Sequence, residues 1–472
     1  MVAGYPVLLV RNKMEFSALG SRCPHYGAPL SKGVLRGHRL RCPWHGSCFN
    51  IKTGDIEEYP SLDCLPCFKV ISVEDGKVFV TAKKKVLTTP AATSLIGVAA
   101  LACAETLRQE GFTGRIIMAT KEKHAPYDKS KLSKEMNLKA EDIYLRKPEF
   151  FCAHGIELWT EKEAVSVDFQ KQKVRFMDGS SQKYNQLFIA TGGNSSFLKV
   201  PGADLQNVCH LQTPEDSSKV LELASGKNLV IVGASFIGME AAAFLSDKAA
   251  VISVVEKHEF PFQKTLGPQV GGVVLKMLQS KGVKFYMKKE LHELKGKDGK
   301  VSHSLAAFVL IPFLAGVTPN SAFLKGTSIA KDNSGAILVD LHMQTNIPNV
   351  FAGGDVVSFP VALLNGDHSS IHHQQVAEAH GSIAAFNMLK KQKELYTVPF
   401  FWTTMLGRSI HYAGRMGQRE RGMKGHNSLH PSVFSSRDGF VTAAASLNCD
   451  PMVSLIAEVL YLGKKISKEE AE

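Results

Sequence analysis

The 472-residue sequence contains no apolar run long enough to cross a membrane. Its longest apolar run, Leu305–Val317, contains Pro312 and is shorter than the roughly 20 residues that a transmembrane helix needs. The first residues, Met1–Val10, also lack the basic segment, apolar segment and cleavage site of a secretory signal. We therefore expect neither a transmembrane segment nor secretion.

Cysteine is sparse as well. Nine cysteines, an odd number, are spread over the whole chain and do not resemble the dense disulfide framework of a small secreted protein. This usage favours an intracellular, reducing compartment. The formal charge is +12, but acidic and basic residues are interspersed along most of the chain, so we expect a solvated basic surface and no nucleic-acid partner.

Two dithiol patterns of redox enzymes are missing or lack their usual context. The Cys-x-x-x-x-Cys pattern of disulfide reductases does not occur near Cys103, which argues against a disulfide substrate. Cys64 and Cys67 have the spacing of a redox dithiol, but no thioredoxin-like βαβ pattern surrounds them, so structural cysteines are favoured. We expect Cys48 to be a free thiol.

The length of the chain predicts two to four domains. From Tyr5 to about Ala82, short β-like runs are punctuated by Gly, Pro and Asp, which predicts a small all-β domain. Beyond the linker-like Lys83–Pro90, β-rich and helical segments alternate, which predicts parallel sheets covered by helices. After about Leu389, the texture changes again, and Phe400–Trp402 begins a mixed α/β C-terminal domain.

Two motifs near the N-terminus have cysteine and histidine at metal-ligand spacing. They are Cys23-Pro-His25 and Cys42-Pro-Trp-His45-Gly, separated by sixteen residues and each in a Pro/Gly-rich loop between β-like runs. Thiolates suit an iron pair, and two imidazoles on the second iron raise its reduction potential, as in a Rieske [2Fe–2S] centre. A mononuclear Cys2His2 zinc site is the alternative, although zinc fingers carry their second ligand pair on a helix and not on a Pro-flanked loop.

The segments around these ligands, CPHYGAPL and RCPWHGSCF, resemble the Rieske ferredoxin domain. The resemblance places Cys23 and Cys42 on one iron and His25 and His45 on the other. The Rieske family has further strands before the position of Tyr5, so we expect the β-barrel to be incomplete at its N-terminus.

A strand–turn–helix pattern in the middle of the chain has the features of a dinucleotide site. The apolar run Asn228–Val232 is followed by Gly233-x-Ser235-x-x-Gly238 and an alanine-rich helical stretch. Gly233 permits the tight turn, Gly238 allows close helix packing, and Ser235 replaces the glycine that lets the backbone approach a pyrophosphate. Glu256, eighteen residues beyond Gly238, ends the next apolar run, where a carboxylate binds ribose hydroxyls and repels a 2′-phosphate. We therefore predict NADH in preference to NADPH, the alternative being a glycine-rich turn without a ligand.

An earlier segment has a weaker form of this pattern. In Ser94-Leu-Ile-Gly97-Val-Ala-Ala100, only Gly97 and the small Ala100 fit the glycine turn, because Leu95 occupies the position of the first glycine. Downstream, the run that ends in Thr191-Gly192-Gly193 resembles the strand and turn that approach FAD in flavoproteins with two dinucleotide-binding domains.

The segment Thr345–Asp355 resembles the second FAD signature of the same superfamily. The resemblance implies that Asp355 accepts hydrogen bonds from the ribityl chain and that Gly354 lets the loop pass the pyrophosphate. Taken alone, the segment is also compatible with an ordinary strand that ends in a Gly–Asp turn.

The order of these motifs, with ALACAETLRQEGFTGRI, PYDKSKLSKEM and VPFFWTTMLGRSIHYAG, resembles the apoptosis-inducing-factor-like flavoproteins that carry a Rieske domain, and more distantly ferredoxin reductases. The resemblance covers essentially the whole chain. It implies a multidomain fold with an all-β Rieske domain, an α/β flavoprotein fold with two dinucleotide-binding domains, and a mixed α/β C-terminal domain. The implied boundaries are 1–84 for the Rieske domain, 85–94 for a linker, 95–222 and 319–390 for FAD binding, 223–318 for NAD(P)H binding, and 391–472 for the C-terminal domain.

The same resemblance implies site residues. Lys129 and Lys134 would lie near the FAD phosphates or isoalloxazine, and Glu122 or its neighbour Lys121 would bind the FAD ribose. Glu240 would lie near the nicotinamide and Trp402 close to the flavin edge, which makes these two the candidate catalytic residues.

The implied function is an NAD(P)H-dependent oxidoreductase, cytoplasmic or mitochondrion-associated, in which NADH reduces FAD and single electrons pass to the [2Fe–2S] cluster and an unknown acceptor. Two features depart from the family. Leu95 replaces the first glycine of the FAD turn, and Ser302–Val317 is an apolar run where the family has a hairpin, a strand and a Gly-x-Gly-like turn. We expect these departures to weaken FAD binding. Two alternatives are an apoptosis-related scaffold or signalling protein without flavin turnover, and a reductase component that serves an oxygenase or similar partner.

Overall fold

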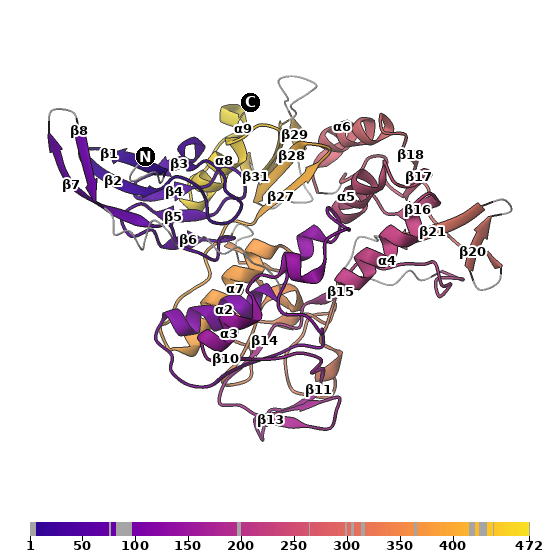
Figure 1. Cartoon of the computed structure of the whole chain (residues 1–472), viewed down its shortest axis with the longest axis horizontal. Coiled ribbons are helices and arrows are strands. Elements are labelled where there is room, and N and C mark those ends of the chain that lie inside the picture. The colour runs from indigo at the N-terminus through magenta and orange to yellow at the C-terminus, as the bar shows by residue number, and fades with distance from the viewer. Residues whose placement is uncertain are drawn as a thin grey trace.

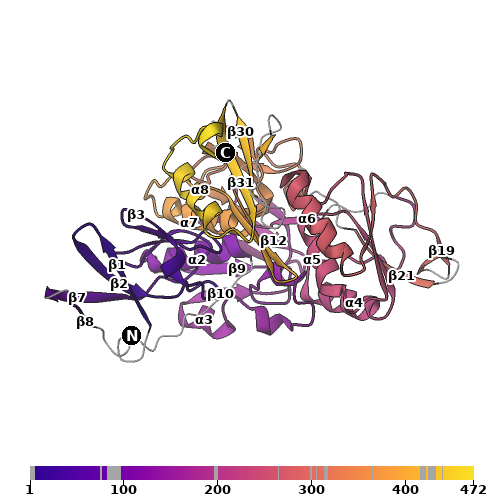
Figure 2. The same ribbon diagram turned by 90° about the horizontal axis from the view of Figure 1, so that it is seen from above.

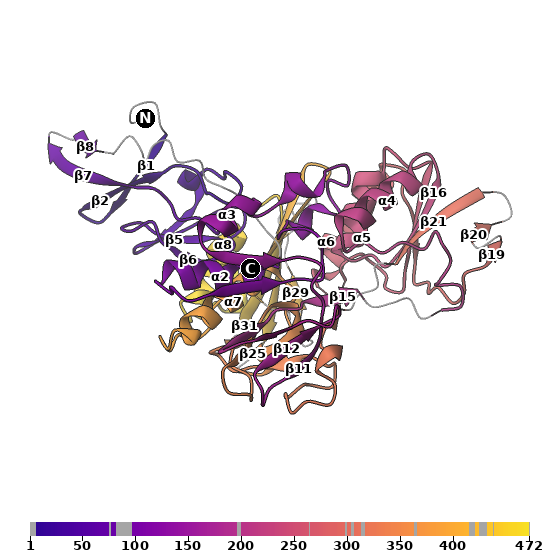
Figure 3. The same ribbon diagram turned by 60° about the horizontal axis from the view of Figure 1, so that its bottom comes forward.

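The computed structural model describes residues 6–74, 77–81, 97–195, 200–263, 265–297, 300–303, 306–312, 317–362, 366–414, 421–423, 432–437 and 439–471. These residues form an N-terminal unit, two α/β units and a C-terminal unit. The N-terminal unit and the second α/β unit lie at opposite ends of the molecule, with the other two units between them (Figures 1, 2 and 3). The expected linker 85–94 and Leu95 lie outside the described residues.

The N-terminal unit consists of two four-stranded antiparallel sheets with the orders β1-β2-β7-β8 and β3-β4-β5-β6, as the short β-like runs predict. Its strands are β1 (Val7–Asn12), β2 (Glu15–Gly20), β3 (Val34–Arg36), β4 (Arg39–Arg41), β5 (Cys48–Asn50), β6 (Ile56–Glu58), β7 (Cys67–Glu74) and β8 (Lys77–Thr81). The loop after β2 carries the first predicted ligand pair and the β4–β5 loop carries the second.

The first α/β unit is built around two packed helices, α2 (Val98–Gln109) and α7 (Gln374–Met388). A Cβ on Gly381 would lie 2.0 Å from the carbonyl oxygen of Ala99, so a larger residue would push the helices apart. Two parallel strand pairs, β9–β10 and β14–β24, and two three-stranded sheets complete the unit. These elements are β9 (Ile116–Ala119), α3 (Pro148–Ala153), β10 (Ile156–Trp159), β11 (Ala164–Asp168), β12 (Lys173–Phe176), β13 (Ser181–Lys183), β14 (Leu187–Ile189), β23 (Ile337–Leu338), β24 (Val350–Ala352), β25 (Val357–Pro360) and β26 (His368–Ser369).

The second α/β unit contains a six-stranded sheet with the order β18-β17-β16-β21-β20-β19. Strands β16, β17, β18 and β21 are parallel, and β19–β20 form an antiparallel hairpin. The antiparallel pair β15 (Gly193–Ser195) and β22 (Val317–Pro319) joins this unit to the first. The other elements are α4 (Pro214–Ala224), β16 (Asn228–Val232), α5 (Phe236–Leu245), β17 (Val251–Glu256), α6 (Gly267–Gln279), β18 (Lys284–Met287), β19 (Gly296–Lys297), β20 (Lys300–His303) and β21 (Ala306–Pro312).

The structure bears on two expectations about this unit. Part of the family pattern is present near Ser302–Val317, because β19–β20 form a hairpin and residues 308–312 of β21 pair with β16. Residues 304–305 and 313–316, where the Gly-x-Gly-like turn would fall, lie outside the described residues. Strands of parallel sheets read as near-continuous apolar runs, which accounts for the composition of β21. The expected boundary at 222/223 falls inside α4, which contacts β21, so we propose that the second α/β unit begins before Pro214.

The C-terminal unit has an antiparallel sheet with the order β27-β28-β31-β30-β29, on which helix α8 packs. Its elements are β27 (Phe400–Met405), β28 (Arg408–Gly414), β29 (Arg421–Met423), β30 (Ser432–Arg437), β31 (Phe440–Leu447), α8 (Met452–Tyr461) and α9 (Lys468–Ala471). Among the described residues of the four units, no helix is both long and apolar enough to span a membrane.

Candidate redox site where the units meet

The two predicted ligand loops bring Cys23, His25, Cys42 and His45 together. The Nδ1 atoms of His25 and His45 are 3.0 Å apart, and Cys23 hydrogen-bonds to Cys42 through the two sulfur atoms. This nitrogen–nitrogen distance lets both imidazoles bind one metal ion at the about 2.0–2.1 Å that such ligation requires. The four donor atoms are therefore arranged as a sulfur pair and a nitrogen pair.

The separation of these pairs distinguishes between the two metal centres that the sequence left open. Among the described residues, no three of the four donor atoms lie within 4.8 Å of one another. A single tetrahedral zinc ion with ligand bonds of about 2.0–2.3 Å would bring all four within that distance. Two irons, one for the sulfurs and one for the imidazoles, fit the observed arrangement.

Burial and backbone amides prepare the ligands for metal binding. Burial lowers the pKa of His25 to about 3, which keeps its imidazole neutral. Burial acts to raise the pKa of Cys42, but its hydrogen bond with Cys23 and the backbone amides of His45 and Trp44 lower that pKa below its usual value. The second loop therefore favours a thiolate, the form that binds iron.

Trp402 on β27 lies against both ligand imidazoles. Its ring centroid is 4.6 Å from that of His45, with the planes 34° apart, and 5.5 Å from that of His25 in an edge-to-face arrangement. Gly46 follows His45 with φ +76°, and a Cβ there would lie 2.7 Å from the ring of Phe400. Glycine thus lets the second ligand loop contact β27 directly.

Glu240 on α5 is buried where three units meet. Its carboxylate forms a 3.0 Å ion pair with Lys134 of the first α/β unit and accepts hydrogen bonds from the hydroxyls of Ser133 and Thr403. A cavity of about 120 Å³ beside this pair is lined by Lys134, Glu240, Ala243, Phe244, Thr404, Met405 and Leu406. Burial, and after it the charges of His25, His411 and Lys134, lower the pKa of His45.

The two predicted FAD turns meet at the start of α2. Gly97 precedes the helix with φ +59°, Ala100 follows in its first turn, and Gly354 has φ +77°. A Cβ on Gly354 would lie 3.4 Å from that of Ala99, so the second turn passes close to the helix. Backbone N–H groups at a helix N-terminus suit a phosphate group, and the residues present therefore fit a dinucleotide.

Charged residues of the first α/β unit surround this turn. Burial raises the pKa of Asp355, against the opposing effect of the nearby charges of His372 and Lys129. Lys129 Nζ also lies 3.2 Å from a carboxylate oxygen of Glu122, whereas Lys121 is exposed to solvent. This contact favours Glu122 over Lys121 as the ribose ligand.

Thr191 and Gly192 follow β14, whose last residue, Ile189, accepts a 3.0 Å hydrogen bond from the N–H of Gly353. The hydroxyl of Thr191 donates to the carbonyl of Asn320 at 2.8 Å, and the N–H of Asn320 donates to the carbonyl of Gly192 at 2.9 Å. The segment therefore lies between the second FAD turn and the crossing to the second α/β unit.

The predicted NADH residues form one turn. Gly233 has φ +102°, and the Ser235 hydroxyl caps α5 by accepting from the N–H of Gly238 at 3.5 Å. Glu256, at the end of β17, accepts from the N–H of Ala234 at 2.7 Å. The carboxylate thus lies at the glycine turn, where the adenosine ribose would bind.

Several residues near the site were not found from the sequence. His380 accepts a hydrogen bond from the N–H of Gly354 at 3.2 Å, and His411, opposite Trp402 on β28, forms a 2.6 Å ion pair with Asp450. Isolated histidines carry no local signal of such contacts. His372, whose charge affects the pKa of Asp355, is part of a doubled histidine before α7, and that doubling is a local signal in the sequence.

Comparison with known proteins agrees with this geometry. Residues 96–381 match the pyridine nucleotide-disulphide oxidoreductase family and residues 1–69 match the Rieske [2Fe-2S] domain. Apoptosis-inducing factor 3 of Homo sapiens is 44% identical over 99% of this chain and 82% of its own length. A ferredoxin reductase from Rhodopseudomonas palustris has a similar structure, with a TM-score of 0.74 and 24% identity over 80% of this chain and 95% of that one. The putidaredoxin reductase–putidaredoxin complex gives a TM-score of 0.74 and 22% identity over 79% of this chain and 93% of that one.

Proposed function

We propose that this member of the pyridine nucleotide-disulphide oxidoreductase family passes electrons from NADH to its own cluster across the contact between Trp402 and His45. Within that family, the chain belongs to the apoptosis-inducing-factor-like flavoproteins with an N-terminal Rieske domain. It is an NAD(P)H oxidoreductase with an all-β Rieske domain followed by a multidomain flavoprotein fold. Its cofactors are a [2Fe–2S] cluster, FAD and NADH.

We assign the cofactors to the residues that meet in the site. Cys23 and Cys42 would hold one iron, and His25 and His45 the other. FAD would be held by Gly97, Ala100, Glu122, Lys129, Thr191, Gly192, Gly354 and Asp355, and NADH by Gly233, Ser235, Gly238 and Glu256. When bound, these groups supply hydride transfer, the conversion of a two-electron donor into single electrons, and one-electron transfer.

The protein's part is to position these groups. The buried ion pair between Glu240 and Lys134 joins α5 to the first α/β unit, while the hydroxyl of Thr403 joins it to β27. These contacts connect the three units at Glu240, the buried member of the pair, while Lys134 is 22% exposed. Trp402 places an apolar, polarisable ring against both ligand imidazoles.

The contact between Trp402 and the two ligand imidazoles is the observation that carries the proposal. Its test is a count of iron, sulfide and flavin in the purified chain, followed by anaerobic addition of NADH with absorption and EPR detection. We expect flavin bleaching and a reduced-cluster signal of low average g. Iron–sulfur bands without flavin bands would instead favour the scaffold alternative, and bound zinc would exclude the redox function.

We infer that the final acceptor takes single electrons from the N-terminal unit, and a ferredoxin-type protein is the candidate that the relatives suggest. The putidaredoxin reductase structure is a complex with putidaredoxin, a separate protein, whereas here a Rieske domain is part of the chain. For location we propose an intracellular compartment, cytoplasmic or mitochondrion-associated. All nine cysteines lie in the described residues and none forms a disulfide, which supports a reducing environment.

A further inference from the structure

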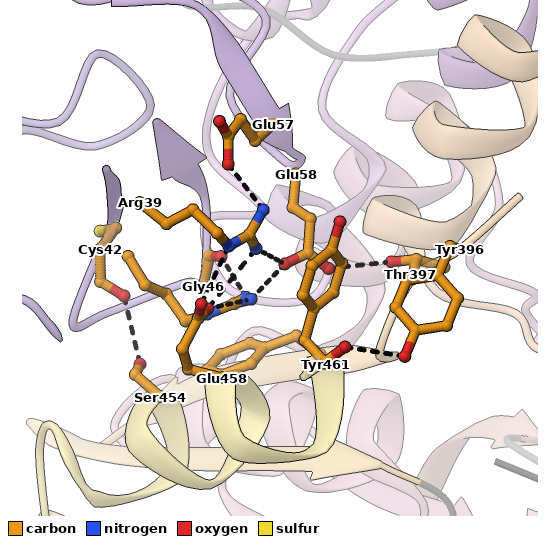
Figure 4. Close-up of polar contacts among 12 residues, drawn as sticks. Arg39, Cys42, Gly46, Glu57, Glu58, Tyr396, Thr397, Ser454, Glu458 and Tyr461 are labelled. Atoms are coloured by element: carbon orange, nitrogen blue, oxygen red, sulfur yellow. Dashed lines mark hydrogen bonds and ion pairs between the residues drawn. The ribbon is translucent and has the colours of Figure 1, made fainter. Parts of the chain in front are cut away.

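A buried charge cluster joins the Rieske domain to helix α8 of the C-terminal unit (Figure 4). The Nε atoms of Arg39 and Arg41 each donate to the carboxylate of Glu458 at 2.9 Å. Glu58 binds both guanidinium groups from the Rieske side, and Arg39 also lies 3.8 Å over the ring of Tyr461. Arg41 and Glu458 are only 1% and 2% exposed, so solvent does not screen these contacts.

The same helix contacts the backbone of the second ligand loop. The hydroxyl of Ser454 donates to the carbonyl oxygens of Cys42 at 3.1 Å and Pro43 at 3.2 Å. At the other end of the loop, Arg41 Nη1 donates to the carbonyl of Gly46 at 2.9 Å. The loop that carries Cys42 and His45 is thus tied to α8 directly at its start and through Arg41 at its end.

The two α8 residues act together because of their spacing. Ser454 and Glu458 are four residues apart, which places them on one face of the helix toward the Rieske domain. Leu455, in the same turn, is 50% exposed. Glu458 lies beside Arg39 and Arg41 just before the loop, so it fixes the strand that leads into the ligands.

We propose that α8 is a positioning element for electron transfer, in which Ser454 and Glu458 hold the second ligand loop against Trp402 so that the chain's own cluster is the fixed first acceptor. The inference rests on the proposed transfer between flavin and cluster. Neither residue contacts the ligand side chains in the described structure, and both act through Arg39, Arg41 and the loop backbone.

Cys48, Glu58 and Glu458 bring three metal-ligating atoms within 4.8 Å of one another, but they do not form a second metal site. The guanidinium groups of Arg39 and Arg41 already bind both carboxylates. Burial, as the dominant effect, raises the pKa of Cys48 to about 12, so its sulfur is a neutral thiol. The cluster is therefore a structural clamp.

The test compares Glu458→Gln and Ser454→Ala with two controls, Leu455→Ala on the exposed side of α8 and Ser454→Thr, which keeps the hydroxyl. Ferricyanide reduction by NADH reports on the flavin and should stay near the wild-type rate in all variants. Reduction of the cluster by NADH in a single turnover should slow by about tenfold or more in Glu458→Gln, because small displacements of reacting groups carry large rate penalties. Ser454→Ala should show a smaller loss that Ser454→Thr restores.

Hydrogen exchange gives a readout that is independent of turnover. Peptides covering residues 39–48 should exchange faster in Glu458→Gln than in wild type, while the EPR signal of dithionite-reduced protein shows that the cluster is still assembled. The inference would be overturned if both Glu458→Gln and Ser454→Ala reduced the cluster and exchanged amide hydrogens at the same rates as the wild-type protein. A wild-type protein whose flavin, but not cluster, is reduced by NADH would instead overturn the proposed function. If Glu458→Gln does not fold, the pair Ser454→Ala and Ser454→Thr decides alone.

Discussion

The indole of Trp402 and the imidazole of His45 lie with their ring centroids 4.6 Å apart, although 357 positions separate the two residues in the chain. Trp402 is held on β27, which pairs with β28 along its whole length. His45 is held by a loop whose glycine packs on the neighbouring Phe400. Two rigid elements from opposite ends of the sequence thus fix a contact between the Rieske ligands and the flavoprotein.

Replacement of Trp402 by Ala should slow the reduction of the cluster by NADH by about tenfold, equivalent to about 1.4 kcal/mol in the barrier. The rate of flavin reduction should fall much less, because the ring contacts of Trp402 are with the ligand imidazoles of His25 and His45. Stopped-flow absorption at flavin and cluster wavelengths measures both rates. Trp402→Phe keeps an aromatic ring and is the matched control, and an equal loss of both rates in Trp402→Ala would contradict the assignment.

Replacement of His45 by Ala should remove the reduced-cluster EPR signal, because one iron loses one of its two proposed imidazole ligands. FAD content and ferricyanide reduction by NADH should persist, since the flavin residues belong to another unit. Metal analysis and EPR test this prediction. The control is His38→Ala, an exposed histidine of the same domain, and an unchanged cluster in His45→Ala would exclude His45 as a ligand.

Replacement of Glu240 by Gln should destabilise the protein by about 1–3 kcal/mol, because the buried end of the ion pair loses its charge while Lys134 stays partly exposed to solvent. The double variant Glu240→Gln with Lys134→Met should lose less than the sum of the single changes, since it removes both charges. Urea unfolding of the three variants gives the coupling energy. Additive losses would show that the two residues do not form a coupled pair.

Replacement of Glu256 by Gln should shift the preference from NADH toward NADPH by about tenfold in the ratio of kcat/KM values, because the charge that repels a 2′-phosphate is removed. Gln keeps a carbonyl oxygen that can accept from the N–H of Ala234, so the turn should stay intact. Steady-state kinetics with both nucleotides measure the ratio. Glu259→Gln, an exposed change in the next segment, should leave it unaltered.

The contact between α8 and the Rieske domain should weaken in acid. Burial acts to raise the pKa of Glu458, but Arg39 and Arg41 outweigh it and hold the pKa below its usual 4.5. The clamp therefore contributes fully above pH 4.5 and is lost as the pH falls through the lower folded-state value. Hydrogen exchange of residues 39–48, corrected for the intrinsic pH effect, should rise below that value in wild type. In Glu458→Gln, this acid-induced rise in hydrogen exchange should be absent.

Short stretches of sequence determined much of this protein. The Rieske ligands, the strand–turn–helix at Asn228–Glu240 and the acid at Glu256 were all predicted, because each depends on residues within one loop or one βα unit, where spacing fixes geometry. The all-β, α/β and mixed order of the units was likewise predicted and confirmed.

Tertiary structure decided the rest. The strand β21 within Ser302–Val317 was not recognised, because its identity as a strand depends on pairing with β16, some eighty residues earlier. The choice of two irons over one zinc depended on the distance between the sulfur and nitrogen pairs, which residue spacing does not encode. The contacts of Glu240 with Thr403, of His45 with Trp402 and of Arg41 with Glu458 join residues 163, 357 and 417 positions apart. Such pairs form only when the units dock, because packing of whole surfaces, and not local conformation, sets which distant side chains meet.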